Sequence, residues 1–266
     1  MFAGQPMGYL NFMRLSSLLL ILMVLLNACS LLPGKIDETK NWSAAKLYTE
    51  AKSNLGDGNY ETAIDYFEKL EARYPFGRYA QQAQLEIAYA YYKYDEPDSA
   101  ISAADRFIKT NPQHPNVDYA YYLKGLVNFS RGQSIIDKFL PRDLSQRDPG
   151  YARKAFFDFQ KLVKRFPDSR YAGDARQRMV YLRNILARYE LHVADYYMRR
   201  GEYLAAANRA RYVLANYEGT PSQADALVVM VRAYRKLKLP ALAADARRVL
   251  KLNYPKRAAE LKTASD

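Results

Sequence analysis

The sequence predicts an all-α protein, a solenoid of five helix-turn-helix repeats, and three observations support this prediction. After Trp42, apolar residues recur at spacings of three and four, the period of an amphipathic helix, and alanines are frequent. No convincing run of alternating polar and apolar residues predicts a strand. One spacing also recurs, because an alanine precedes a proline by twelve residues at Ala63–Pro75, Ala100–Pro112, Ala155–Pro167 and Ala243–Pro255.

The first 28 residues differ from the repeats and predict a signal peptide. Their only charged residue is Arg14, which precedes an apolar run from Leu18 to Leu26. That run is too short to cross a bilayer but suits the core of a secretory signal. Met13 alone would open a compact signal, which leaves the true start codon undecided.

The apolar run ends in Leu26-Asn27-Ala28-Cys29, which resembles the lipobox of bacterial lipoproteins. We therefore expect cleavage before Cys29, a covalent lipid on Cys29, and no other cofactor. The alternatives are a buried thiol or an ordinary signal with an incidental cysteine. Because the protein has one cysteine, it forms no internal disulfide. Residues 29–41 predict a lipidated tether, and Ser30 in place of an aspartate resembles lipoproteins that are sorted to the outer membrane.

The first repeat carries Gly58, Tyr60, Ala63 and Phe67, which match the turn and second helix of a tetratricopeptide repeat. In that repeat, a small residue lets two helices approach and an aromatic residue fills the next gap. Each proline of the recurring spacing is expected to end a second helix, because proline cannot continue one. The predicted repeats span residues 44–77, 81–114, 118–169, 187–221 and 224–257.

Three of the repeats depart from this pattern. The fourth keeps Gly201, Tyr203 and Ala206 at the turn, but Glu218 stands where its proline is expected. Repeats 2, 4 and 5 place Ala104, Ala210 and Arg247 where the aromatic residue would sit.

Two irregular segments divide the repeats into halves. Residues 130–150 predict a long loop within the third repeat, because they contain prolines, glycines and mixed charges. Residues 173–200 predict one long helix, or two joined tightly, that links repeats 1–3 to repeats 4 and 5. The N-terminal half then covers residues 42–172, and the C-terminal half covers residues 173–266.

The net charge of +12 is concentrated in the second half of the chain. Residues 35–110 have a net charge of −3, whereas residues 147–266 hold 25 basic and 12 acidic residues, a net charge of +13. We expect this half to face an acidic partner protein, the alternative being an ordinary solvated surface. The export signal and the lack of a recognisable binding module argue against nucleic acid.

No arrangement of residues in the sequence predicts catalysis or metal binding. His192 and Asp195 lie one helical turn apart, and with Glu190 they could form a fragment of a metal or acid/base site. The sequence offers no third ligand, HExxH motif or glycine-rich phosphate loop, so we interpret the pair as an ordinary contact on a helix face. His114 lies between two prolines and predicts a turn residue. We therefore expect a protein that is not an enzyme.

The first helices predict an aromatic groove. With Leu47, Ala51 and Asn54 on the core side, the opposite positions are rich in tyrosine and include lysines. Such a groove suits an extended peptide with alternating aromatic residues, whose C-terminal carboxylate the ammonium groups would bind. The alternative is that the tyrosines pack between helices. The predicted groove residues are Tyr48, Lys52, Tyr89, Tyr92, Lys93, Tyr119, Tyr122 and Phe129.

Several longer motifs go beyond a generic repeat. They are Arg73-Tyr74-Pro75-Phe76-Gly77, Tyr89-Ala90-Tyr91-Tyr92-Lys93, Asp105-Arg106-Phe107-Ile108, Asn111-Pro112, His114-Pro115-Asn116, Arg147-Asp148-Pro149, Ala194-Asp195-Tyr196-Tyr197 and Asn208-Arg209. With the lipobox, they resemble the BamD family, also called ComL or YfiO, the tetratricopeptide lipoproteins of the bacterial β-barrel assembly machinery.

The resemblance implies a periplasm-facing lipoprotein on the inner leaflet of the outer membrane. Its N-terminal repeats would receive the aromatic C-terminal signals of unfolded outer-membrane β-barrel proteins. Its C-terminal repeats would dock onto the last POTRA domain of BamA and onto accessory lipoproteins, with residues 130–150 as a further accessory contact.

Arg209 matches an arginine that the family uses toward BamA. Because alanines flank it, we expect it to reach out from its helix and pair with an acidic residue of the partner. Arg188 and Arg199 are the other predicted docking residues. Two rival functions remain: a periplasmic repeat lipoprotein that scaffolds cell-wall synthesis, and a lipoprotein that binds peptidoglycan.

Overall fold

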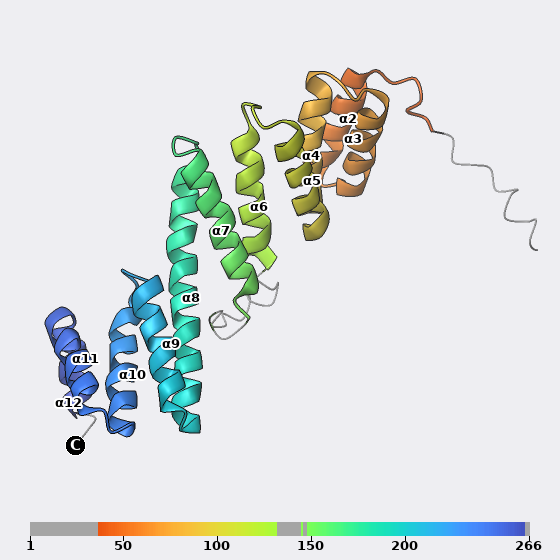
Figure 1. The fold of residues 1–266 in the computed structure, drawn as a ribbon. Coiled ribbons are helices and arrows are strands. Elements are labelled where there is room, and N and C mark those ends of the chain that lie inside the picture. The colour runs from red at the N-terminus through yellow and green to blue at the C-terminus, as the bar shows by residue number, and fades with distance from the viewer. Residues whose placement is uncertain (1–36, 132–144, 146–147, 264–266) are drawn as a thin grey trace, which may run out of the picture. The chain divides into compact units, whose positions relative to one another are not determined.

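The computed structural model describes residues 37–131, 145 and 148–263 (Figure 1). The described residues before Ala44, 37–43, belong to a separate unit, in which the Thr39 amide and hydroxyl donate hydrogen bonds of 3.1 and 2.6 Å to Asp37 Oδ1. From Ala44 onward, the chain forms a second compact unit, and all of its regular structure in the described part is helical. The predicted signal peptide, Cys29 and most of residues 130–150 lie outside the described residues.

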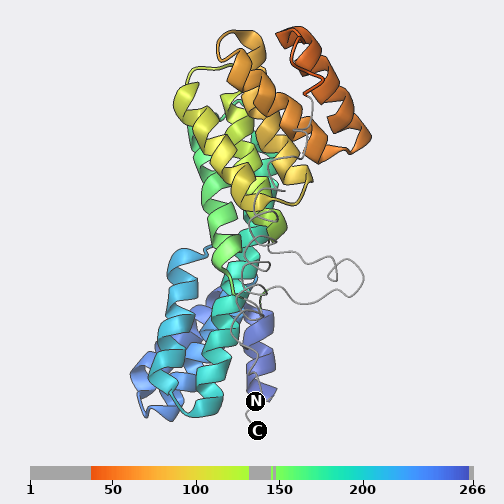
Figure 2. The same cartoon turned by 90° about the vertical axis from the view of Figure 1, so that its right-hand side faces the viewer.

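The described helices of this second unit form five antiparallel pairs and a last single helix. Each helix packs against the next along the chain, so the pairs stack in sequence order (Figures 1 and 2). The predicted all-α repeat fold is thereby confirmed. The pairs are α2 (Ala44–Asp57) with α3 (Tyr60–Arg73), α4 (Arg78–Lys93) with α5 (Pro97–Thr110), α6 (Val117–Arg131) with α7 (Gly150–Arg165), α8 (Ala172–Arg200) with α9 (Tyr203–Asn216), and α10 (Ser222–Lys236) with α11 (Pro240–Asn253), followed by α12 (Pro255–Thr263).

The same tight turn joins the two helices in four of the pairs. Its key residue has a left-handed backbone, with φ of +84° at Gly58, +61° at Asp95, +80° at Gly201 and +59° at Lys238. The next amide then reaches back to a carbonyl five residues earlier, which closes the end of the first helix. These bonds run from Asn59 to Asn54, Glu96 to Tyr91, Glu202 to Tyr197 and Leu239 to Tyr234, at 2.9 to 3.0 Å.

The second helices end where the proline spacing predicts. α3 ends at Arg73, and Tyr74 has φ −130° and ψ 65° before Pro75. Tyr217 adopts a similar conformation, φ −126° and ψ 49°, although no proline follows it. Pro255 both follows α11 and begins α12, since proline is well tolerated in the first turn of a helix.

The core repeats with the same period as the turns. In each second helix, the alanine of the pattern is buried, and the residue seven positions later is completely buried. The interior is therefore a stack of equivalent layers, as expected for a solenoid. The alanines are Ala63, Ala100, Ala155, Ala206 and Ala243, and the later residues are Leu70, Phe107, Leu162, Val213 and Leu250.

The α6 and α7 helices approach each other closely at Gly125. A β-carbon added there would lie 2.4 Å from Cε1 of Phe159, well inside van der Waals contact. The missing side chain of Gly125 is therefore what admits the buried ring.

One helix serves both halves of the stack. α8 is continuous over 29 residues, and its first part, including Ala175 and Leu182, shares a core cluster with α7. Its second part, including Leu186 and Ala194, shares another cluster with α9 and α10. Figures 1 and 2 both show α7 and α9 along different lengths of this helix. No helix in the described part of the chain is long and apolar enough to cross a membrane.

Candidate functional site

The predicted groove residues lie on the first helices α2, α4 and α6, in the order expected from the repeats. The aromatic ones are half-buried, whereas Lys52 and Lys93 are exposed. Several of these rings, those of Tyr48, Tyr119, Tyr122 and Phe129, contact aromatic rings on other helices. The interpretation that these tyrosines pack between helices therefore holds in part, and the remainder of each ring faces solvent.

Tyr48 on α2 contacts aromatic rings on α3 and α4. The ring of Tyr48 lies 5.9 Å from that of Phe67 and 5.5 Å from that of Tyr79. Burial, and then the nearby Glu86 carboxylate, raise the pKa of the Tyr48 phenol. Lys52 Nζ forms an ion pair of 2.8 Å with Glu86 Oε1, so a carboxylate of the same chain neutralises this ammonium group.

The second predicted lysine is held differently. Lys93 ends α4, and its ammonium group lies 5.9 Å from the ring centre of Tyr60, the first residue of α3. Tyr89 and Tyr92 contact each other on α4, with ring centres 6.4 Å apart.

Tyr119 and Tyr122 on α6 contact Tyr171 at the start of α8. The ring of Tyr171 lies 5.3 Å from that of Tyr119 and stacks on that of Tyr122 at 4.8 Å. The Tyr122 hydroxyl and Arg178 Nε both donate 2.6 Å hydrogen bonds to Asp174 Oδ2. Burial, and then the bond to Asp174, raise the pKa of Tyr122 to about 12.

The electrostatic balance of Asp174 favours its ionised form. Burial alone would raise its pKa, but Arg178 and the Tyr122 hydroxyl outweigh that effect and lower it. Arg178 also covers the ring of Phe129, whose centre lies 4.8 Å from the guanidinium carbon and 5.9 Å from the ring centre of Tyr181. The predicted aromatic series thus continues from α6 onto α8.

Residues outside the predicted groove complete this surface. A signal was present, because Arg-Tyr-Ala occurs at residues 78–80 and 170–172, at the start of α4 and α8. Both tyrosines of this motif contact the preceding first helix. We call the combined surface the tyrosine face; it comprises Tyr48, Lys52, Tyr79, Glu86, Tyr89, Tyr92, Lys93, Tyr119, Tyr122, Phe129, Tyr171, Asp174, Arg178 and Tyr181.

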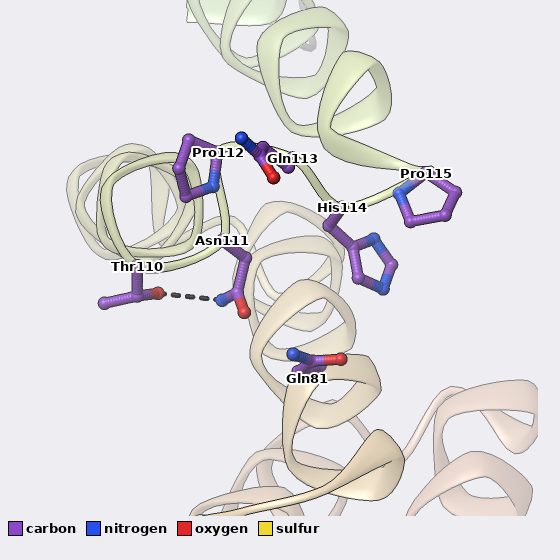
Figure 3. Close-up of a pocket in the computed structure, with 7 residues that line it drawn as sticks. All are labelled: Gln81, Thr110, Asn111, Pro112, Gln113, His114 and Pro115. Carbon is purple, nitrogen blue, oxygen red and sulfur yellow. Dashed lines mark hydrogen bonds between the residues drawn. The ribbon is translucent and has the colours of Figure 1, made fainter.

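A shallow hollow of about 400 Å³ lies beside the turn from α5 to α6 (Figure 3). Its walls are Gln81, Thr110, Asn111 and residues 112–115. The Asn111 side-chain nitrogen Nδ2 donates 2.8 Å bonds to Gln84 Oε1 and to the Thr110 hydroxyl, which fixes one wall. His114 Nδ1 accepts the Asn116 amide at 3.1 Å, in keeping with a turn residue.

The prediction that Arg209 reaches out freely from its helix is wrong. Its Nη1 donates a 3.1 Å hydrogen bond to Glu190 Oε2 on α8, and the Glu190 side chain is only 4% exposed. Burial works against protonation, but Glu190 and Tyr197 raise the Arg209 pKa overall. Because the Arg209 side chain remains 45% exposed, one side of it still faces solvent.

The other two predicted docking residues lie on α8. Arg188 and Arg199 are both exposed, and eleven residues separate them, about 16 Å along the helix axis. Arg209 meets this helix at Glu190, two residues beyond Arg188.

His192 contacts a residue of the predicted loop. Its Nε2 and the hydroxyl of the buried Ser145 share a hydrogen bond of 2.9 Å. Among residues 37–131, 145 and 148–263, no group of three or more histidine, cysteine or acidic residues is placed to hold a metal ion.

Comparisons with known proteins agree on one family. A family model described as "YfiO: Outer membrane lipoprotein" matches residues 40–250. A relative from Neisseria meningitidis serogroup B, named outer membrane protein assembly factor BamD, is 49% identical over 235 residues, covering 87% of this chain and 88% of the relative. Proteins of the same name from Xylella fastidiosa and Vibrio cholerae are 42% and 36% identical, each covering 88% of this chain and 82% and 96% of the relative.

Proposed function

Because the chain belongs to the YfiO family of outer membrane lipoproteins, we propose that it is a non-enzymatic scaffold in the assembly of outer-membrane β-barrel proteins. The tyrosine face is the observation that carries the proposal. It presents half-exposed rings from four successive first helices, held in place by contacts between those helices. Aromatic side chains of an extended peptide would find rings to stack on at each repeat.

The peptide that fits this face is the aromatic C-terminal end of an unfolded β-barrel protein. Its terminal carboxylate needs a cation, and Lys52 is already paired with Glu86. Lys93 is exposed and has an aromatic ring as its described contact, so we assign the carboxylate to Lys93.

A peptide-binding experiment tests this assignment. Binding of a peptide with an aromatic C-terminus is measured with a free carboxylate and with an amide end. The native chain should prefer the carboxylate roughly tenfold, the value of one charge-assisted hydrogen bond. The Lys93→Ala variant should lose that preference, whereas the Lys52→Ala variant should keep it. Equal binding of both peptides by the native chain would contradict the assignment.

The second part of the proposal is docking by the C-terminal half. Glu190 holds Arg209 from inside the protein and leaves its outer side exposed, in a region with a net charge of +13. An acidic surface on the last POTRA domain of BamA would complete the pair, with Arg188 and Arg199 adding charge along α8. Accessory lipoproteins of the same machinery are the other proposed partners.

A pull-down from detergent-solubilised outer membranes tests the docking. The tagged chain should bring down a β-barrel protein with POTRA domains. Recovery of cell-wall enzymes without that protein would contradict the proposal and favour a cell-wall scaffold.

The proposed location is the inner leaflet of the outer membrane, facing the periplasm, with the lipid on Cys29 as anchor. Several acyl chains together give stable attachment, where one gives marginal binding. Mass spectrometry of the mature chain should find the lipid on Cys29, and the Cys29→Ser variant should be released into the soluble fraction. A native chain without this mass increase would rule out the anchor.

A further inference from the structure

The turn between α3 and α4 exposes an aromatic side chain. Phe76 is 91% exposed, more than any other large hydrophobic residue in the described part of the chain. Isolated apolar residues on a surface are common, so the backbone and the charges around Phe76 decide what its exposure means.

The backbone holds Phe76 in this outward position. The Tyr74 amide donates a 2.8 Å bond to the Leu70 carbonyl, and Pro75 follows directly. Gly77 has φ +94° and ψ 178°, a conformation open in practice only to glycine. α4 then begins at Arg78, so fixed elements bound the turn on both sides.

The position of this turn in the fold is defined by the first repeat. Because α2 and α3 are antiparallel, Ala44 at the start of α2 and Arg73 at the end of α3 lie at the same end of the pair. The fifteen residues from Cys29 to Ala44 span at most about 50 Å when fully extended. If Cys29 carries the proposed lipid, on which this inference rests, this end of the repeat stays within that distance of the bilayer.

The charges at the turn suit an anionic surface. Residues 73–85 contain two arginines and no acidic residue. The Arg78 guanidinium lies 4.9 Å from the ring centre of Tyr79 and donates a 3.1 Å bond to its hydroxyl, which keeps it beside the turn. At the opposite end of the same helices, the turns carry Asp57, Asp95 and Glu96.

We propose that the Phe76 turn is a second membrane contact, which inserts Phe76 into the headgroup region of the leaflet that holds the lipid anchor. Arg73 and Arg78 would then lie at the level of the lipid phosphates. Aromatic rings favour this interfacial depth, and basic residues near an anionic surface add to the attraction. A single protruding side chain offers no walls to select a peptide, whereas a bilayer requires none.

Fluorescence in vesicles tests the insertion. In a Trp42→Phe background, the lipidated full chain carries either Phe76→Trp or the control Leu252→Trp, whose parent residue on α11 is 80% exposed. Vesicles of phosphatidylethanolamine and phosphatidylglycerol contain brominated acyl chains, which quench nearby indoles. The Phe76→Trp fluorescence should be quenched and shifted to shorter wavelength, and the control should not change. Equal quenching of both variants would overturn the proposal.

A second measurement separates this proposal from the lipid anchor. The unlipidated Cys29→Ser chain should bind phosphatidylglycerol vesicles weakly, and Arg78→Ala should weaken that binding about fivefold. The control Arg248→Ala, whose parent side chain on α11 is 78% exposed, should bind like its parent. If mass spectrometry finds no lipid on Cys29, the proposed anchor fails, but an effect of Arg78→Ala on vesicle binding still supports the membrane contact at the Phe76 turn. A shift of the Phe76→Trp emission with purified BamA, but not with vesicles, would overturn the membrane contact in favour of a protein contact.

Discussion

The pair of Arg209 and Glu190 gives the sharpest prediction, because it joins stability to docking. Glu190 is almost completely buried, and Arg209 is the cation that the structure places on it at 3.1 Å. Removing one partner of a fully buried pair costs about 3–5 kcal/mol, because the other charge is left uncompensated. Since the Arg209 side chain is 45% exposed, water replaces part of what is lost, and we expect about 2 kcal/mol for Arg209→Ala.

Thermal unfolding followed by circular dichroism measures this loss. For a chain of this size, about 2 kcal/mol lowers the midpoint by roughly 4–8 °C. Glu190→Gln should cost less than about 1 kcal/mol, because the amide oxygen still accepts the bond from Arg209. In the double variant, Glu190→Gln with Arg209→Ala, no charge is left buried, so at least half of the lost stability should return.

The double variant also makes the docking test decisive. A charge reversal at Arg209 alone would place two carboxylates together and weaken docking by disturbing the fold. The double variant keeps the fold but lacks the arginine, so it should still fail to bring down the POTRA protein. An Arg209→Ala chain as stable as the native one would refute the role of the pair, and normal docking by the double variant would refute the docking role of Arg209.

Three further predictions concern the turns, the core and the tyrosines. Lys238→Gly should raise the free energy of unfolding by about 0.5–1 kcal/mol, because glycine removes the cost of a left-handed backbone, and Gly201→Ala should lower it by about 1 kcal/mol. A denaturant titration that ranks the two variants in the opposite order would contradict the turn geometry. Gly125→Ala should lower the free energy of unfolding by about 1–3 kcal/mol, because its methyl group is forced against Phe159, and adding Phe159→Leu should recover part of that loss. Unchanged stability of the Gly125→Ala variant would show that α6 and α7 separate easily. Folding raises the Tyr122 pKa from 10.0 to about 12, mainly by burial and then by the bond to Asp174, so the contribution of Tyr122 to stability is complete below pH 10 and is lost as the pH rises to about 12. Unfolding curves across this range should show a smaller loss for Tyr122→Phe than for the native chain, and identical losses would contradict the raised pKa of Tyr122.

The regular part of the fold was predictable because it depends on local covalent geometry. The spacing of Ala63 and Pro75 located the end of α3, since proline acts on its own helix and needs no distant partner. The left-handed residues Asp95 and Lys238 gave no such signal. At these two positions, the packing of the two helices outweighs the preference of about 1–2 kcal/mol for a right-handed backbone. Helix propensities do not include such tertiary packing.

The candidate site was predictable as a set of helix positions but not as a set of partners. Helical periodicity placed Lys52 opposite the core, yet its partner Glu86 lies 34 residues away on another helix. Arg209 was likewise expected to be free, because the depth of Glu190 depends on how α8 packs against α9. Among the missed residues, Tyr79 and Tyr171 had a readable signal, because both belong to the recurring Arg-Tyr-Ala motif.

The continuity of α8 has a mechanical consequence. Its 29 residues extend about 43 Å as one rod, so the two halves of the solenoid have no loop between them that could act as a hinge. A tilt imposed on its first turns, where Tyr171 and Asp174 meet α6, is carried by hydrogen-bonded backbone to the turns that hold Arg209. The rod therefore links the orientation of the tyrosine face to that of Arg209, and the halves can move independently only where α8 bends or its packing against α7 and α9 shifts.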